Sequence, residues 1–226
     1  LAYIAMVADG VGGGRGGAKA SATTVEIATQ YLVGSMKCYY GADSAEDDFI
    51  NALQAAAMRC HAEVLERAKA DDDVRRMATT LTLFMGVWPW YYLLQVGDSR
   101  YYLYRHGRLT QVTRDQTIAQ DLVDEGVFTP AVAQRSRFSS ILSSAIGGEQ
   151  TEPRVTRLQA SWQNVHLICS DGLTKHVTDE QIAARLASMT SAKQACETLV
   201  QDALDGGGTD NVTVIVGRST PKDATK

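Results

Sequence analysis

The sequence lacks several features that would assign it to well-known classes of protein. No apolar run approaches ~18 residues, so we expect no membrane-spanning segment. The net charge is −4, with 22 basic against 26 acidic side chains, which argues against a nucleic-acid partner. The four cysteines form no CxxC pair and the four histidines are scattered, so we expect no zinc site. Unpaired cysteines favour reduced thiols in a cytoplasmic protein.

The composition is that of an ordinary folded protein. The chain has 226 residues, of which 45% are hydrophobic and 21% charged. These values predict one domain covering residues 1–226 with a core of its own. Leu1 to Ala8 are apolar and no basic residue precedes them, which predicts a buried strand and not a signal peptide.

Hydrophobic periodicity predicts an α+β fold with an antiparallel meander in its middle. Strand patterns separated by tight turns cannot form parallel crossovers, because those need a dozen or more residues. Capping boxes mark helix starts at Ser44/Asp47, Thr178/Gln181 and Ser191/Gln194. The expected strands cover 1–8, 80–87, 91–96, 100–105, 108–113, 154–159, 164–169 and 211–216. The expected helices cover 18–32, 43–70 and 115–125, with two more after 178 and 191, and 126–144 is expected to be an irregular flap.

Four aspartates share one local setting, the end of a strand beside a small residue. They are Asp9, Asp98, Asp171 and Asp210. Each aspartate taken alone is more often a turn-forming residue than a metal ligand. Gathered together they would repel one another, and a hard divalent cation such as Mg²⁺ or Mn²⁺ would relieve that repulsion. A binuclear site of this kind lowers the pKa of a bridging water and holds a phosphoryl group.

Other motifs point to different chemistry, and we consider them weaker. Gly12 to Gly17 satisfies G-x-G-x-x-G, but the second parallel strand of a dinucleotide-binding unit is missing. Ser170 does not lie in a G-x-S-x-G nucleophile elbow. His166 alternates within a strand and is expected to be structural or exposed. The acidic run 71–73 is expected to be a solvated loop and not a metal site.

Six sequence blocks occur in the order typical of a known family. The chain resembles the metal-dependent protein serine/threonine phosphatases (type 2C, PPM), particularly their compact bacterial members. The blocks are VADGVGG (7–13), MATTLT (77–82), VGDSRYYLYRHGRLTQVTRDQT (96–117), AIGG (145–148), LICSDGLTKHVTDEQI (167–182) and GGTDNVTVIV (207–216).

The resemblance implies a four-layer α-β-β-α sandwich, in which an antiparallel β-sandwich is flanked by helical pairs. It implies two Mn²⁺ or Mg²⁺ ions bridged by Asp9, bound by the Gly10 carbonyl and completed by Asp171 and Asp210. Asp98 would join Asp171 at a third metal site. A metal-bridging water would hydrolyse phosphoserine or phosphothreonine in a protein substrate, in a signalling pathway with a Ser/Thr kinase. The flap, about 126–144, would affect substrate choice, and we expect a monomer.

The sequence departs from the family pattern at several points. An initial strand carrying a phosphate-binding Arg and an Asn-Glu-Asp run is absent before Leu1, so we expect a domain that lacks its N-terminal strand. Val11 replaces the His of animal members, Ala78 a Gly and Gln116 a His. Arg15 is a candidate replacement for the phosphate-binding Arg, but an exposed loop residue is the simpler interpretation. The alternative function is therefore a pseudophosphatase or regulatory binding domain of the same fold without turnover.

Overall fold

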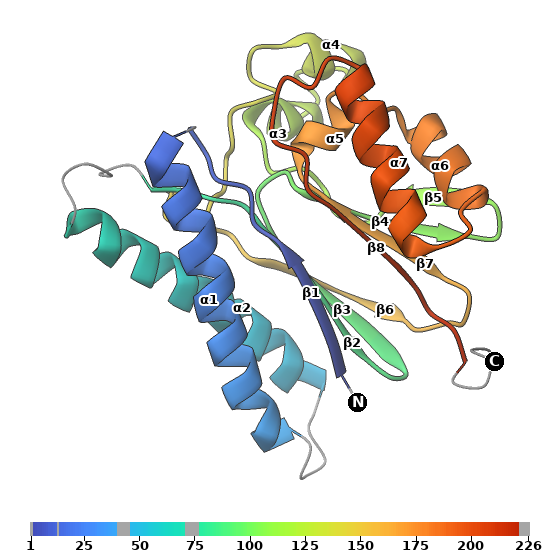
Figure 1. Cartoon of the computed structure of the whole chain (residues 1–226). Helices are drawn as coiled ribbons and strands as arrows, with labels where there is room; N and C mark the ends of the chain where they lie inside the picture. Colours follow the sequence, from blue (N-terminus) through green and yellow to red (C-terminus); the bar gives the residue numbers. More distant parts are fainter. Residues whose placement is uncertain (1, 13, 40–45, 71–76, 222–226) are drawn as a thin grey trace.

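Two four-stranded antiparallel sheets form the centre of the molecule (Figure 1). The computed structural model describes residues 2–12, 14–39, 46–70 and 77–221. The first sheet has the order β1-β2-β3-β6 and the second the order β5-β4-β7-β8. The strands are β1 (Ala2–Val7), β2 (Leu81–Val87), β3 (Trp90–Val96), β4 (Arg100–Arg105), β5 (Arg108–Gln111), β6 (Arg154–Gln159), β7 (Val165–Cys169) and β8 (Val214–Arg218).

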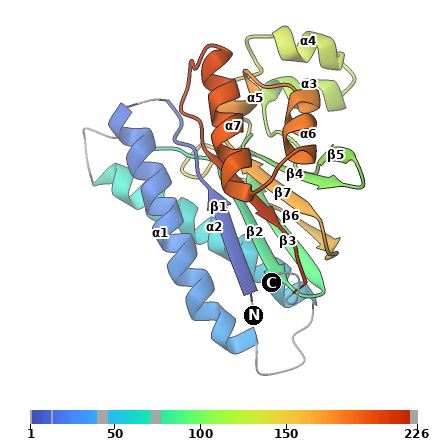
Figure 2. The same ribbon diagram turned by 45° about the vertical axis from the view of Figure 1, so that its right-hand side comes forward.

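Helices cover the outer faces of both sheets (Figures 1 and 2). The helices α1 (Gly14–Tyr39) and α2 (Glu46–Lys69) pack on each other, and α2 contacts β3 and β6. On the other side α5 (Asp171–Thr174), α6 (Asp179–Ala187) and α7 (Ala192–Asp205) contact β7, β5 and β8 respectively. Two short helices, α3 (Ile118–Asp124) and α4 (Pro130–Arg135), follow β5. The expected α-β-β-α arrangement is confirmed. Within the described residues, none of the helices has the length and apolarity needed to cross a membrane.

Successive side chains along a strand point to opposite faces of its sheet, so each sheet packs against helices on one face and against the other sheet on the other. On β2, Leu81 and Leu83 are fully buried in the core beneath α1 and α2, whereas Phe84 faces the opposite sheet. All five residues of β7 are buried, because its two faces contact different layers. The core between the two sheets is small and includes Val7 from the first sheet and Tyr101 from the second.

A polar group also lies between the sheets. The ring of His166 is buried and its Nδ1 lies 2.6 Å from the Tyr101 hydroxyl, while its Nε2 lies 2.9 Å from Ser219 Oγ. Burial lowers the pKa of His166 to about 4, so the ring is neutral at pH 7. Among the expected alternatives for this residue, the structural role is confirmed.

Several element boundaries differ from the sequence predictions. α1 starts at Gly14, four residues before the predicted start, so Arg15 is an exposed helical residue and not part of a loop. The helix predicted over 115–125 begins only at Ile118, because Gln116 is bonded to the β3–β4 turn and Thr117 caps the helix. The flap contains the helix α4, started by Thr129 and Pro130, and was wrongly predicted to be irregular.

Two further predictions about the C-terminal half need correction. β8 begins at Val214 and not at Asn211, because the Ser170 side chain binds the backbone of Asn211 and Thr213 and removes them from the ladder. The Thr178/Gln181 capping box is complete, but Gln194 Oε1 accepts from Thr190 N, so the Ser191 box is only half formed. The Ser44/Asp47 box and the acidic run 71–73 involve residues outside the described ranges.

Candidate functional site

The four aspartates singled out by the sequence line one pocket of about 220 Å³. Asp9 follows β1, Asp98 lies in the β3–β4 turn, Asp171 starts α5 after β7, and Asp210 precedes β8. Strand register accounts for part of this convergence. Arg100 pairs with Cys169, and continuing that antiparallel register places Asp98 opposite Asp171.

Two consecutive threonines hold the backbone of Asp9. The Asp9 amide donates to Thr80 Oγ1 at 3.0 Å, and the Asp9 carbonyl accepts from Thr80 N and Thr79 Oγ1, both at 2.8 Å. Thr80 Oγ1 is also hydrogen-bonded to Ser99 Oγ at 2.7 Å. Val7 pairs with Thr82, so the same register carries Asp9 to Thr80 beyond the end of the strands. The MATTLT and GDSR blocks therefore position the first aspartate.

Two glycines permit close backbone contacts around the carboxylates. A Cβ on Gly10 would lie 2.3 Å from the carbonyl carbon of Gly17, so the glycine cluster lets the end of β1 lie against the first turn of α1. A Cβ on Gly172 would lie 2.1 Å from the carbonyl oxygen of Asn211. Gly172 therefore allows the loop that carries Asp210 to approach Asp171.

The pocket concentrates negative charge. Burial raises the pKa of Asp98 to about 7, with further contributions from Asp171, Asp115 and Asp9. Burial also raises the pKa of Asp9 to about 6, helped by Asp171 and Asp210. Burial first, and the acidic neighbours second, thus shift both carboxyls toward the neutral form.

One cation is held among these carboxylates. Lys175 Nζ lies 2.7 Å from Asp171 Oδ2 and 2.6 Å from Asp210 Oδ2. The hydrogen bond from Lys175 lowers the pKa of Asp210. Burial alone would lower the pKa of Lys175, but its hydrogen bonds to the two carboxylates raise it instead. His176 supports the same loop, since its Nε2 lies 2.8 Å from Thr209 Oγ1.

The donor set fits a hard divalent cation. Asp171 Oδ1 is buried and receives no hydrogen bond within the described part of the chain. The neighbouring Asp9 carboxylate can form a hydrogen bond to Asp171 only if one of the two carboxyls is protonated. Carboxylate and carbonyl oxygens are the ligands that Mg²⁺ and Mn²⁺ prefer. In the described residues, however, no three His, Cys, Asp or Glu side chains already form a ligand cluster. The ammonium of Lys175 contacts two of the carboxylates instead.

Sequence reasoning identified the aspartates but missed the residues that hold them. Thr79, Thr80 and Ser99 lie inside recognised motifs. Their roles depend on distant hydrogen bonds, however, because Thr79 and Thr80 bond to Asp9 across about seventy positions and Ser99 bonds to Thr80 across 19. Lys175 was detectable, because it lies four residues after Asp171 and so on the same side of a helical turn.

The flap and the departures from the family pattern also have defined places. Ser140 and Leu142 from the flap line the pocket, as does Val11, whereas Arg15 does not. Gln116 accepts from Gly97 N at 2.7 Å through Oε1 and so supports the turn that carries Asp98.

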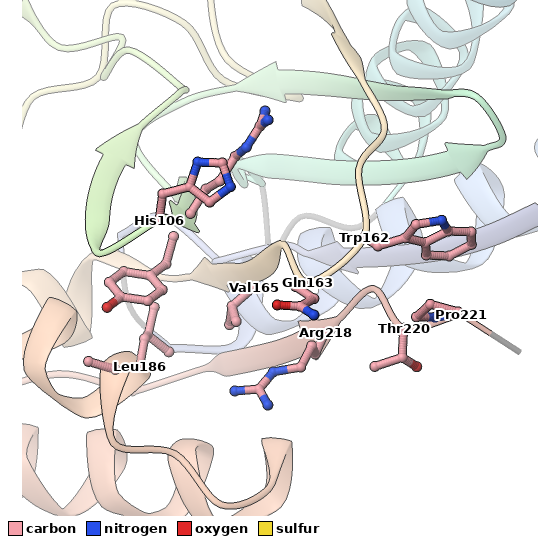
Figure 3. A pocket seen from close by; sticks show the side chains of 11 residues that line it. His106, Trp162, Gln163, Val165, Leu186, Arg218, Thr220 and Pro221 are labelled. Atoms are coloured by element: carbon pink, nitrogen blue, oxygen red, sulfur yellow. The ribbon is translucent and has the colours of Figure 1, made fainter. Parts of the chain in front are cut away.

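A larger hollow of about 680 Å³ lies at the opposite end of the second sheet, where β4 and β8 end and β7 begins (Figure 3). Its lining includes His106, Trp162 and Arg218, and it contains none of the four aspartates. Among the residues that the structure describes, none that lines this hollow is acidic, so its volume does not make it a competing site for a divalent cation. The smaller carboxylate pocket is the candidate functional site.

The chain is similar in sequence to bacterial serine/threonine phosphatases. The serine/threonine protein phosphatase PstP of Mycobacterium tuberculosis is 35% identical over 215 residues, which are 95% of this chain and 40% of PstP. The chain thus spans two fifths of PstP. The serine/threonine phosphatase Stp of Listeria innocua is 30% identical over 216 residues, covering 94% of this chain and 83% of Stp.

The fold has close counterparts among solved structures. A crystal structure of the PstP catalytic domain in complex with two manganese ions superposes with a TM-score of 0.82 at 32% identity, covering 98% of this chain and 91% of that one. Residues 1–206 match the family model described as Protein phosphatase 2C. With that match, the two four-stranded sheets and the six ordered motifs, the chain belongs to the protein phosphatase 2C family.

Proposed function

We propose that this chain is a metal-dependent protein phosphatase that hydrolyses phosphoserine and phosphothreonine. The observation that carries the proposal is the convergence of Asp9, Asp98, Asp171 and Asp210 on one pocket, with one lysine as its cation. The PstP catalytic domain, which has the same fold, binds two manganese ions. We assign Asp9, the Gly10 carbonyl, Asp171 and Asp210 to two Mn²⁺ or Mg²⁺ ions, and Asp98 with Asp171 to a third.

The residues of the chain have separate tasks in this proposal. Bound divalent ions would supply a water nucleophile at neutral pH and neutralise phosphoryl charge. Thr79 and Thr80 fix the backbone of Asp9, so the carboxylate needs little reorganisation before it binds an ion. Ser140 and Leu142 of the flap segment, 126–144, line the pocket, so the flap would contact the protein around the phosphorylated side chain.

The wider setting follows from the relatives. PstP and Stp are named serine/threonine phosphatases, so we propose a phosphorylated protein as substrate and a Ser/Thr kinase as the opposing activity. A cytoplasmic location and a monomeric state remain predictions from the sequence. Light scattering coupled to size-exclusion chromatography tests the monomer.

The decisive experiment measures phosphate release from a phosphothreonine peptide with and without Mn²⁺. We expect Mn²⁺-dependent release by the purified chain and its loss in Asp171→Asn. Asp205→Asn is the matched control, because this exposed aspartate lies on α7 away from the pocket lining. No arginine is found among the described residues that line the pocket, where Lys175 supplies the positively charged side chain. Mn²⁺ binding without any turnover would favour the regulatory binding domain over the enzyme.

A further inference from the structure

The described lining of the carboxylate pocket contains a single basic side chain, that of Lys175. This lysine bridges two acidic residues from different parts of the chain. Asp171 is one helical turn away, whereas Asp210 is 35 residues away and precedes β8. Their side chains are 23% and 41% exposed, against 38% for Lys175, so the ion pairs lie at the edge of the pocket.

Hydrogen bonds hold both Lys175 and its partner Asp210 in place. Its backbone N–H donates to the Asp171 carbonyl at 2.9 Å, and its side chain folds back to Oδ2 of the same residue. The other oxygen of Asp210, Oδ1, accepts from Asn211 N at 2.8 Å. Lys175 is therefore what joins Asp210 to Asp171 through their side chains.

We propose that Lys175 is a displaceable counter-cation that competes with a divalent metal ion for Asp171 and Asp210. This inference rests on the proposed function, because it takes both aspartates as metal ligands. A divalent ion on the two Oδ2 atoms cannot share them with an ammonium group 2.6–2.7 Å away, since the two cations repel and would occupy the same space. Metal binding through these two oxygens then requires the Lys175 side chain to leave.

Displacement of Lys175 has two consequences. The free energy of metal binding is reduced by the cost of breaking two charge-assisted hydrogen bonds, so a neutral side chain at this position gives tighter binding. The released ammonium stays tethered to α5 by a flexible four-carbon stem and keeps its positive charge near the bound ion. In the metal-free protein, the same lysine holds the loop of Asp210 against α5.

The test titrates the metal-stripped full chain with MnCl₂ by isothermal calorimetry. We expect Lys175→Met to bind Mn²⁺ about tenfold more tightly or better, because one unit of competing positive charge is removed. Lys175→Gln serves as a second neutral variant. Lys175→Arg keeps the positive charge and should bind Mn²⁺ as weakly as the unsubstituted protein. The control is Lys193→Met, which removes an 85% exposed lysine from α7 and should leave the affinity within about twofold.

Thermal unfolding supplies an independent readout. In EDTA, Lys175→Met should melt below the unsubstituted protein, because the carboxylates of Asp171 and Asp210 then lack their counter-cation. In saturating Mn²⁺ this difference in melting temperature should vanish or change sign, because the metal ion replaces the lysine. A purely structural salt bridge would lower the melting temperature under both conditions.

The outcomes separate this inference from the proposed function. Equal Mn²⁺ affinities for the unsubstituted protein and both neutral variants, with metal-dependent phosphatase activity intact, overturn the role of Lys175 alone. Weaker binding in the neutral variants also overturns it. Absence of Mn²⁺ binding and turnover in every variant rejects both proposals. Binding that appears only when Lys175 is neutralised supports the competition directly.

Discussion

Replacing Thr80 by valine should test how the site is positioned, because the change removes one hydroxyl and keeps the shape of the side chain. Thr80 is 2% exposed and Ser99 is fully buried. The Thr80 hydroxyl accepts from the Asp9 amide and bonds to Ser99 Oγ. Valine leaves both of those groups without this partner, in a region where water has no access to Ser99.

The magnitude follows from the number of groups left unpaired. An unsatisfied buried polar group costs about 1–3 kcal/mol, so two such groups predict that the free energy of unfolding falls by roughly 2–6 kcal/mol. This is a large share of the ~5–15 kcal/mol that stabilises a typical protein. The change also removes one of the three hydrogen bonds that hold the Asp9 backbone, so phosphatase activity at saturating Mn²⁺ should decrease beyond the fraction of unfolded protein.

Urea unfolding in EDTA measures the stability of Thr80→Val, and phosphopeptide hydrolysis measures its activity. Thr29→Val is the matched control, because the Thr29 hydroxyl bonds to the Val25 carbonyl on the exposed side of α1. That change should alter the free energy of unfolding by no more than about 0.5 kcal/mol. If Thr80→Val and Thr29→Val behave alike, the hydroxyl network does not position Asp9, and the reasoning fails.

Three further predictions concern glycine and charge. Gly172→Ala places a Cβ 2.1 Å from the Asn211 carbonyl oxygen, so circular dichroism melts should show strong destabilisation and Mn²⁺ titration weaker binding; unchanged values would contradict the close approach. Gly34→Ala meets no atom within 4 Å on the exposed side of α1, and should stabilise the protein by up to about 1 kcal/mol in urea unfolding. Burial and neighbouring carboxylates raise the pKa of Asp98 from 3.8 to about 7, so without metal the folded state binds more protons than the unfolded state between these values. Its free energy of unfolding should fall as pH rises from about 4 to 7, and Asp98→Asn should gain stability over the unsubstituted protein across that window in urea titrations with EDTA; parallel pH curves would refute this.

The hairpins β2–β3 and β4–β5 were predictable because their connections are short. A two-residue turn at His106–Gly107 can join only antiparallel neighbours, and the sequence shows it between two alternating patterns. The single meander expected over 80–113 was wrong, because β3 and β4 lie in different sheets and the turn between them crosses from one sheet to the other. The start of α1 was not predictable in the same way. Glycine is a poor helix former, yet α1 begins inside the glycine run, where Gly17 lies too close to Gly10 for either residue to carry a Cβ.

The site was predictable only in part, for a related reason. The aspartates are marked locally, since each adjoins a strand end and a small residue. What holds them is non-local: Thr80 reaches Asp9 across 71 positions, and Ser170 binds the backbone of Asn211 across 41. Composition and periodicity carry no information about such contacts, which depend on the register between strands.

The pocket lies where the two sheets meet, and this position explains why the hydroxyl network matters. Asp9 belongs to the end of the first sheet, and Asp171 to the end of the second. The turn with Asp98 and Ser99 connects them, because β3 belongs to the first sheet and β4 to the second. Thr82 on β2 donates to the Ser99 carbonyl at 2.7 Å, and Thr80 bonds to the Ser99 hydroxyl, so the first sheet binds this connection at two points. The separation of the carboxylates is therefore set by how the sheets are joined at Ser99, and a divalent ion bound across the pocket would make the same joint stronger.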